Sequence, residues 1–200
     1  MIKIGITGGI GSGKTLISSV IEYIGYPVFY SDIEAKNILE KDQKVKSEME
    51  ELFGNDIYID NKLNTPLLSN LLFSNKSLIE RVNSIVHPIV RLKFDVWSKE
   101  KKTSIVFNEA AILFETEAYK KFDASILVIA PQEVRLKRVM LRDNLSKEQI
   151  ISRINNQWLD EDKISLATHV ISNNGSDPIL SQIENVIDQL LIFSNSKSKI

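Results

Sequence analysis

The feature that most constrains this chain is a cluster of glycines near its start. Five of the eight glycines in the 200 residues fall within the first thirteen positions: Gly5, Gly8, Gly9, Gly11 and Gly13. Apolar residues alternate before and within this cluster, which predicts a short buried strand over Met1–Thr7, with Ile2, Ile4 and Ile6 on one face. A glycine-rich turn directly after a buried strand indicates a backbone that bends sharply or that another group approaches closely.

The residues after the cluster indicate a helix and then a second strand. From Lys14 onward, apolar residues recur at intervals of three and four and form one helical face: Ile17, Val20, Ile21 and Ile24. Gly25 suits the position just past the end of this helix, and Pro27 prevents its continuation. The run Pro-Val-Phe-Tyr at 27–30 predicts a strand, so the first thirty residues indicate a βαβ unit.

Residues 8–15, Gly-Gly-Ile-Gly-Ser-Gly-Lys-Thr, match the P-loop pattern G-x-x-x-x-G-K-[ST]. Its glycines let backbone N–H groups approach phosphate oxygens, and the following helix points its positive N-terminus at the same anion. Lys14 supplies charge for the β- and γ-phosphates, and the Thr15 hydroxyl can ligate Mg²⁺. The alternative is a chance glycine-rich turn, but the flanking strand and helix favour the P-loop. We expect ATP and Mg²⁺ to bind through Gly9, Ile10, Gly11, Ser12, Gly13, Lys14 and Thr15.

The rest of the chain divides into a helical stretch and a second set of strands. From Ile33 to Lys102 the pattern is mostly helical, without a strong strand pattern and with turn signals at 54–56, 64–66 and His87-Pro88. Short apolar runs at 104–108 and 125–130 are typical of parallel strands covered on both faces, and 169–172 predicts a last strand. The sequence therefore predicts an α/β protein with a helical insertion.

Two more helices are expected in the second half of the chain. Ser146 and Gln149 make a capping-box pattern ahead of an apolar face formed by Ile150, Ile151, Ile154 and Trp158. Asp177-Pro178 precedes a final amphipathic helix, and residues 194–200 are expected to form a frayed polar tail.

Composition excludes several classes of protein. Hydrophobic residues make up 43% and charged residues 26%, which is ordinary for a folded globular protein. The net charge of −1 argues against a nucleic-acid-binding protein, which usually carries a basic excess. No apolar run reaches the ~18 residues that cross a bilayer and no signal-peptide pattern is present, so no membrane association is expected. The absence of cysteine excludes disulfides and thiolate metal sites and favours a cytoplasmic location.

Asp32 is the first carboxylate after the second predicted strand. Ligands of open α/β sheets bind at the carboxyl ends of the strands, so Asp32 is a candidate base for an acceptor hydroxyl in phosphoryl transfer. Ser31 and Glu34 also fit a capping box, in which case Asp32 belongs to a helix N-terminus. The two roles are compatible, because a position at a helix start holds a side chain rigidly.

Three arginines follow the strand at 125–130 with helical spacing. Arg135, Arg138 and Arg142 lie at i, i+3 and i+7 and therefore share one helical face. Such a stripe is usually a solvated charged face. In a kinase it can instead be the inner face of a lid that closes over the phosphates of ATP. Beside a P-loop we favour the lid, with Arg138 and Arg142 stabilising the transferred phosphoryl group.

Together these motifs resemble the dephospho-CoA kinase family. Residues 7–15 read T-G-G-I-G-S-G-K-T, and the family opens with T-G-G-I-G-S-G-K-[ST]. Five further segments follow in the family's order and are similar to its elements D-A-D-x-x-A, L-x-H-P, P-L-L-F-E, Q-x-x-R-x-x-x-R-D and D-x-V-I-x-N-x-G. They are residues 30–35, 85–88, 111–115, 134–143 and 168–175.

The resemblance implies a P-loop NTPase fold with a five-stranded parallel sheet flanked by helices. Residues 1–31, 103–132 and 167–200 would form the nucleotide-binding core, 32–102 the helical acceptor region that binds CoA, and 133–166 the lid. The implied reaction transfers the γ-phosphate of ATP to the 3′-hydroxyl of dephospho-CoA, giving CoA and ADP in the last step of coenzyme A synthesis. The implied protein is a monomer or a weak homo-oligomer.

The resemblance also implies roles for particular residues. It makes Asp32 the catalytic aspartate alongside Lys14, and it places the substrate contacts at Thr7, Asp32, His87, Leu113 and Glu115. Asn173 and Gly175 follow the last strand, where P-loop kinases commonly hold the adenine, although a plain turn before Asp177 is the alternative. Glu109 stands where the family usually has an aspartate, and it either helps to hold Mg²⁺ or is a structural carboxylate.

Two departures and two rival functions remain. Tyr30 replaces the first aspartate of D-A-D, and Ala111 replaces the proline before L-L-F-E. One rival is a P-loop kinase for another small molecule. The other is a nucleotide-gated switch that has no acceptor at all.

Overall fold

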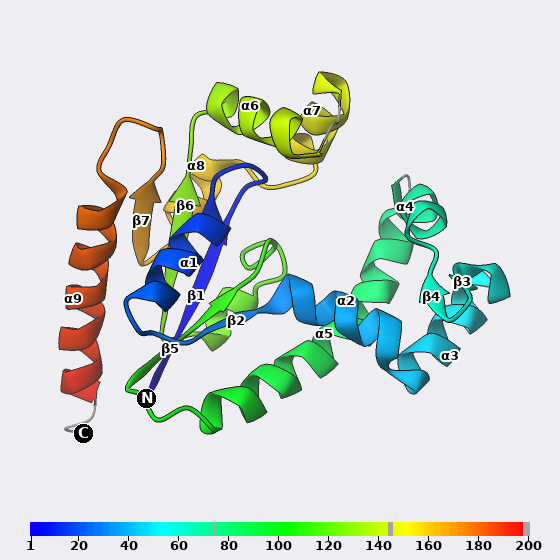
Figure 1. Ribbon diagram of the computed structural model, residues 1–200, viewed down its shortest axis with the longest axis horizontal. Helices are drawn as coiled ribbons and strands as arrows, with labels where there is room; N and C mark the ends of the chain where they lie inside the picture. The colour runs from blue at the N-terminus through cyan, green and yellow to red at the C-terminus, as the bar shows by residue number, and fades with distance from the viewer. Residues whose placement is uncertain (74, 144–145, 198–200) are drawn as a thin grey trace. The chain divides into compact units, whose positions relative to one another are not determined.

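The computed structural model describes residues 1–73, 75–143 and 146–197 of the chain. The chain divides into two compact units (Figure 1). Unit 1 comprises Met1–Tyr30 and Lys101–Ile200, and unit 2 is the continuous segment Ser31–Glu100. Within these described ranges, no helix is both long enough and apolar enough to cross a bilayer.

Unit 1 is built on a five-stranded parallel sheet, as the sequence predicts (Figure 1). In chain order the strands are β1 (Ile2–Gly8), β2 (Val28–Tyr30), β5 (Ile105–Glu109), β6 (Ala124–Ile129) and β7 (His169–Ser172). They lie side by side in the order β2-β5-β1-β6-β7. Because β1 is central, the glycine loop that follows it lies in the middle of the carboxyl edge of the sheet, where open α/β sheets bind ligands.

Helices α1 (Lys14–Tyr23) and α9 (Ile179–Lys197) pack into one hydrophobic core with the sheet. Alternation in β1 directs Ile2, Ile4 and Ile6 into this core, where each is at most 1% exposed. α1 ends as predicted: Gly25 has φ +102°, and the N–H groups of Gly25 and Tyr26 donate to the carbonyls of Glu22 and Ile21 at 2.9 and 3.1 Å.

The frayed tail predicted from Ser194 is wrong for its described part. α9 continues through Lys197, and Ser194 is 3% exposed with its hydroxyl 3.4 Å from the carbonyl of Ser104. The polar residues beyond Leu191 therefore extend the helix, because one face of it still packs on the sheet unit. Residues 198–200 of the predicted tail lie outside the described residues.

The other face of β1 explains Gly5. A Cβ at position 5 would lie 2.5 Å from Cδ2 of Leu113 and 3.4 Å from the ring of Phe122. Leu113 is 2% exposed and belongs to the segment between β5 and β6, which also contains the short helix η2 (Ala118–Lys121). Gly5 is therefore required by close packing on the sheet rather than by the phosphate loop.

Three helices lie between β6 and β7: α6 (Gln132–Asp143), α7 (Lys147–Asn155) and α8 (Asp160–Ile164). The predicted capping box at Ser146 and Gln149 is present at the start of α7. α7 ends at Asn155, so Trp158 lies beyond the helix to which its spacing assigned it. α8 was not predicted, because five residues are too few to show a helical period.

Unit 2 contains α2 (Ser31–Lys41), α3 (Gln43–Phe53), η1 (Asn55–Ile57), α4 (Thr65–Phe73) and α5 (Lys76–Lys99). It also contains an antiparallel hairpin, β3 (Tyr58–Ile59) with β4 (Lys62–Leu63), although no strand was expected between 33 and 102. Asp60 and Asn61 form its turn with φ of +50° and +62°. Two-residue strands are too short to show alternation, and this turn lacks the glycine that usually marks such a hairpin.

The turn predicted at His87-Pro88 is wrong, because both residues lie inside α5. Proline lacks the N–H that would bond to the carbonyl four residues earlier, so a helix around it depends on packing. Val82, Val86, Val90 and Phe94 recur every four residues along α5 and are each 3–7% exposed. This buried stripe continues on both sides of Pro88, and its packing stabilises the helix across the proline.

Candidate active site

The glycine loop joins the central strand to α1. Gly13 is the last residue before the helix and has φ +96°, in the left-handed region. The Ser12 N–H donates to the carbonyl of Gly9 at 3.0 Å, and Ser12 itself is fully buried. A tight turn that opens directly into a helix N-terminus is an anion-binding arrangement, because several backbone N–H groups and the helix dipole act together.

A carboxylate lies beside the lysine and threonine of the loop. The Thr15 hydroxyl donates to Oε1 of Glu109 at 3.1 Å, and Nζ of Lys14 lies 3.9 Å from the same oxygen. Glu109 ends β5, pairs in register with Ile6 of β1 and Tyr30 of β2, and is 6% exposed. The sheet thus places an acidic oxygen next to the loop, although the two are 94 residues apart in the chain.

The oxygen atoms of Thr15 and Glu109 fit Mg²⁺. Hydroxyl and carboxylate oxygens are ligands that this ion prefers, and it commonly takes only one or two carboxylates from the protein and completes its shell with phosphates and water. In residues 1–73, 75–143 and 146–197, no group of three or more His, Asp or Glu side chains lies close enough together to hold a metal ion.

Tyr30 stands where the similar family has an aspartate, but its hydroxyl does not supply a negative charge. Its hydroxyl donates to Oε2 of Glu22 on α1 at 2.6 Å. Burial raises the pKa of the Tyr30 phenol above its usual value, and the hydrogen bond to Glu22 raises it further. The phenol is therefore neutral and committed to α1, which leaves Glu109 as the carboxylate beside Lys14 and Thr15.

Arg138 and Asn173 meet on the glycine loop. The Asn173 side chain is 2% exposed; its amide donates to the carbonyl of Ser12 at 2.8 Å and its oxygen accepts from Arg138 at 3.1 Å. Nη1 of Arg138 also lies 3.4 and 3.3 Å from the carbonyls of Gly11 and Ser12. Residues of α6 and the residue after β7 thus stabilise the loop through its carbonyl groups.

The other predicted residues after β7 lie in a turn. The Asn174 side chain accepts from the N–H groups of Ser176 and Asp177, each at 2.9 Å. Gly175 has φ +93°, and a Cβ added there would meet nothing within 4 Å. Gly175 therefore borders open space, whereas Asn173 is buried against the loop.

Arg142 differs from Arg138 in its surroundings. Its side chain is 64% exposed, and its guanidinium donates two hydrogen bonds to the neighbouring Asp143 at 2.7 and 2.9 Å. This pairing raises the pKa of Arg142 and lowers that of Asp143. The stripe of three arginines therefore has one member in solvent and two members at the loop.

Two residues that contact the loop were not singled out from the sequence. Arg135 is 7% exposed and its Nε donates to the carbonyl of Ile10 at 2.9 Å. Gln157, beyond α7, accepts from the N–H of Ile10 at 2.8 Å. Arg135 was noted only as part of the stripe, and a single glutamine in a polar segment gives no signal of its own.

The expected substrate contacts in unit 1 are largely enclosed. The Thr7 hydroxyl is 3.3 Å from the carbonyl of Ala111, and Thr7 and Leu113 are 1% and 2% exposed. Oε1 of Glu115 lies 3.4 Å from the N–H of Trp158 and 3.8 Å from Nζ of Lys163. Their assignment as substrate contacts stays a prediction.

In unit 2, Asp32 and His87 lie close enough to interact electrostatically. Burial and the charge of Arg91 lower the pKa of His87, while the charge of Asp32 opposes that shift. Asp32 is the second residue of α2 and His87 is in α5, and the ion pair between Glu34 and Lys93 at 2.6 Å also joins these helices. The predicted catalytic aspartate and the predicted acceptor-site histidine are thus brought together.

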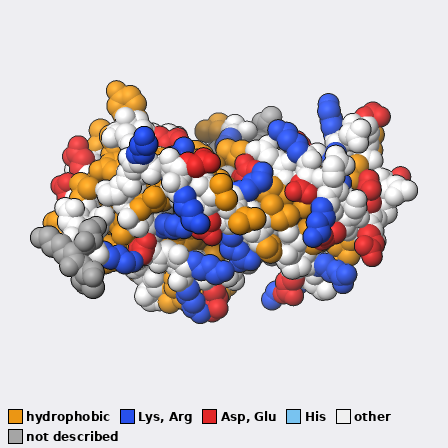
Figure 2. Space-filling model, turned by 90° about the horizontal axis from the view of Figure 1, so that it is seen from below, with side chains coloured by type: hydrophobic (Ala, Val, Ile, Leu, Met, Phe, Trp, Pro, Cys, Tyr) orange, Lys and Arg blue, Asp and Glu red, His pale blue; other side chains and the backbone are white. Residues whose placement is uncertain are grey.

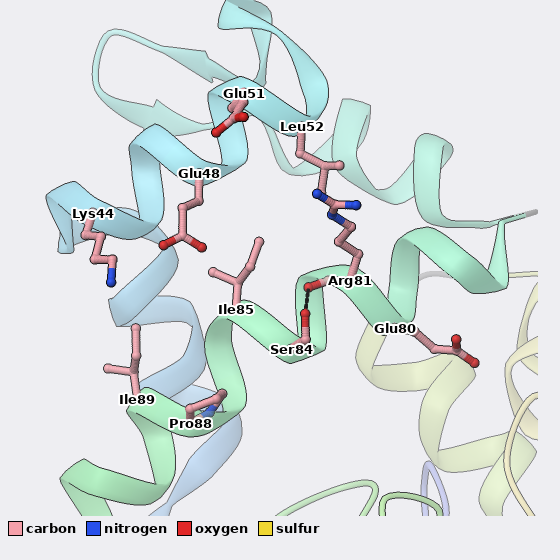
Figure 3. Close-up of a pocket in the computed structure, with 10 residues that line it drawn as sticks. All are labelled: Lys44, Glu48, Glu51, Leu52, Glu80, Arg81, Ser84, Ile85, Pro88 and Ile89. Carbon is pink, nitrogen blue, oxygen red and sulfur yellow. Dashed lines mark hydrogen bonds between the residues drawn. The ribbon is translucent and has the colours of Figure 1, made fainter.

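Unit 2 also has a groove of about 1020 Å³ between α3 and α5. Figure 3 shows side chains of the two helices directed toward one another across it. Its walls contain both charged and apolar side chains, and they are lined by Lys44, Glu48, Glu51, Leu52, Glu80, Arg81, Ser84, Ile85, Pro88 and Ile89. On the face of the molecule in Figure 2, basic and acidic side chains are interspersed, in keeping with a net charge of −1.

The phosphate loop at the end of the central parallel strand, with the carboxylate beside its Lys14 and Thr15, defines a P-loop kinase. A family profile described as dephospho-CoA kinase matches residues 2–178. The chain belongs to the dephospho-CoA kinase family, and its activity is that of an ATP-dependent phosphotransferase in the final step of coenzyme A synthesis.

Similar proteins agree with this membership over nearly the whole chain. The dephospho-CoA kinase of Bacteroides fragilis is 42% identical over 187 residues, covering 93% of this chain and 91% of that protein. The dephospho-CoA kinase of Salinibacter ruber is 36% identical, covering 88% and 90%. Among solved structures, TT1252 from Thermus thermophilus has a TM-score of 0.83 at 33% identity and covers 96% of each chain.

Proposed function

We propose that this chain transfers the γ-phosphoryl group of Mg·ATP to the 3′-hydroxyl of dephospho-CoA with the residues described above. The observation that carries the proposal is the convergence of Lys14, Thr15 and Glu109 at the glycine loop. A loop that binds only phosphate needs no buried carboxylate. Burial of the Glu109 carboxylate costs free energy unless a cation lies beside it. Lys14 supplies part of that charge.

In this proposal the loop holds and neutralises the phosphates. Backbone N–H groups of Gly11, Gly13, Lys14 and Thr15, together with the ammonium of Lys14, bind the β- and γ-phosphates, because the N–H groups of Ile10 and Ser12 already donate within the protein. Thr15 and Glu109 hold Mg²⁺, which when bound neutralises the charge that develops on the phosphoryl oxygens. Arg138, which already reaches the loop carbonyls, stabilises the transferred group, and Arg142 would have to release Asp143 to do the same.

Unit 2 supplies the acceptor side. Asp32 accepts the proton of the 3′-hydroxyl, and the neutral imidazole favoured by the burial of His87 can exchange hydrogen bonds with the acceptor without adding charge. The groove between α3 and α5 combines apolar and polar walls, which suits the amide-containing pantetheine arm of this acceptor. Thr7, Leu113 and Glu115 of unit 1 are proposed as substrate contacts, and Asn173 and Gly175 as adenine contacts.

The test is a coupled assay of ADP release by the purified chain with Mg·ATP and dephospho-CoA. We expect turnover that requires dephospho-CoA and is abolished in Lys14→Met. Turnover with a nucleoside monophosphate or a sugar, but not with dephospho-CoA, would refute the acceptor assignment. ATP hydrolysis that ignores every acceptor would favour a switch instead. A cytoplasmic location and a monomeric or weakly oligomeric state stay predictions.

A further inference from the structure

The two peptide groups that flank the Cα of Ile10 are each held by a residue of the segment between β6 and β7. Arg135 donates through Nε to the Ile10 carbonyl at 2.9 Å, and Gln157 accepts from the Ile10 N–H at 2.8 Å. The Ile10 side chain packs on a cluster formed by Leu136, Val139 and Ile150 of α6 and α7. One residue of the phosphate loop is therefore fixed by its carbonyl, its N–H and its side chain.

Arg135 is itself fixed by buried charges. Its Nη1 lies 3.3 Å from Oδ2 of Asp160, whose Oδ1 lies 3.3 Å from Nζ of Lys163. Lys163 is 2% exposed and lies 3.8 Å from Oε1 of Glu115. Two cations and two anions thus alternate away from the loop, and their compensation lets Arg135 remain charged while nearly buried.

We propose that Arg135 and Gln157 are positioning residues for ATP, which set the shape of the phosphate loop by holding the two peptide groups on either side of Ile10. Neither residue is proposed to contact the reacting atoms. Their effect reaches the nucleotide because Gly11, Gly13 and Lys14 follow Ile10 in the same turn, so a rotation of either peptide group redirects the N–H groups that bind phosphate. The proposal rests on the proposed function only in taking ATP as the ligand of the loop.

The expected effects follow from the type of hydrogen bond lost. A neutral hydrogen bond contributes about two- to tenfold in an equilibrium constant, and a bond to a charged group roughly ten- to hundredfold. Gln157→Met keeps the length of the side chain but removes the acceptor, so the Kd for ATP should rise by about two- to tenfold. Arg135→Met should raise it by roughly ten- to hundredfold. Because the two hydrogen bonds hold adjacent peptide groups of the same residue, their effects should not be independent. The double variant should raise the Kd for ATP by less than the product of the two single effects.

The experiment measures the Kd of ATP by titration calorimetry without acceptor, together with KM for each substrate and kcat. Gln189→Met on α9 and Arg153→Met on the exposed side of α7 are matched controls for the same chemical changes. We expect a higher Kd and KM for ATP in the two test variants, an unchanged KM for dephospho-CoA within about twofold, and values like those of the starting protein in both controls.

Thermal unfolding distinguishes positioning from loss of fold. Gln157→Met should unfold within about 4 °C of the starting protein, since a single bond at a partly exposed site is lost. An unchanged Kd for ATP in Gln157→Met would overturn the proposal, and so would an equal rise in KM for both substrates. Because the Kd is measured without acceptor, the outcome stands even if dephospho-CoA proves to be the wrong acceptor. Should Arg135→Met fail to fold, Gln157→Met alone decides.

Discussion

Replacing Gly13 by alanine tests whether the phosphate loop is shaped by its contact with Asn173. A Cβ at position 13 would lie 2.1 Å from Nδ2 of Asn173, a distance at which one of the two must move. Asn173 is 2% exposed and cannot turn away without losing its bonds to Ser12 and Arg138. The loop or the end of β7 must therefore give way.

The chain offers a matched control in Gly25. Its φ of +102° is close to the +96° of Gly13, but a Cβ there would meet nothing within 4 Å. Left-handed backbone costs an alanine about 1–2 kcal/mol, and the stiffer unfolded chain returns about 0.4–1 kcal/mol. Gly25→Ala should thus lower the free energy of unfolding by about 0–1.5 kcal/mol.

Gly13→Ala carries the same backbone cost and the lost bonds of Asn173 in addition. One neutral hydrogen bond and one to a charged group together contribute about 2–4 kcal/mol. At about 2–4 °C per kcal/mol for a protein of this size, Gly13→Ala should unfold roughly 4–16 °C below Gly25→Ala. Differential scanning calorimetry measures this difference directly, and denaturant unfolding with an unchanged m-value would show that the unfolded state is not its cause.

The contact is isolated by repeating the substitution beside Asn173→Ala. In that background the collision is absent, so Gly13→Ala should cost no more than Gly25→Ala does. If the full cost persists without the Asn173 side chain, or if Gly13→Ala and Gly25→Ala unfold at the same temperature, the reasoning from this contact is refuted.

Three further perturbations address residues to which the proposed function gives a role. Asp32→Asn should lower kcat by roughly 10²–10⁴-fold in steady-state assays while the Kd for ATP stays unchanged. A loss of only a few-fold would mean that Asp32 stabilises the start of α2 and does not act as the base. Glu109→Gln should raise the Mg²⁺ concentration that gives half-maximal turnover by about tenfold or more, and an unaltered Mg²⁺ titration would contradict its place at the metal. Because burial lowers the pKa of His87 in the folded state, the unfolded state binds more protons below about pH 6.5, and stability is lost as the pH falls. His87→Gln should reduce this acid-induced loss between about pH 7 and pH 5, measured by thermal unfolding at each pH; equal slopes in both proteins would argue against it.

Local patterns were sufficient for the elements that bind phosphate. Alternation in β1, the glycines of the loop and the apolar face of α1 all lie within thirty residues. Each pattern supports the assignment of the element next to it. The capping box at Ser146 was equally readable, because its two side chains are three positions apart. A structural feature that depends only on residues close together in the chain can be predicted from the sequence alone.

Contacts between distant segments were not readable in the same way. Pro88 is a turn signal by itself, and it lies in a helix because buried residues flank it on both sides. Gln157 reaches Ile10 across 147 positions, and Thr15 reaches Glu109 across 94. Glu109 was placed near the metal through the family resemblance, but no such pattern pointed to Gln157. Pairings of this kind depend on which strands become neighbours, and that order is a property of the folded sheet.

The strand order has a consequence for how the protein is made. Among the described strands β1 pairs with β5 and β6, so Ile2 must wait for Ile105, and Ile4 for Ala124. A chain leaving the ribosome therefore carries its phosphate loop for about a hundred residues before the strand beneath it gains a sheet partner. Unit 2 is continuous in sequence and its contacts are closer along the chain, so it can fold during that interval. Unit 2 can therefore fold before the sheet forms, whereas the phosphate loop gains its supporting strands only when β5 and β6 have been made.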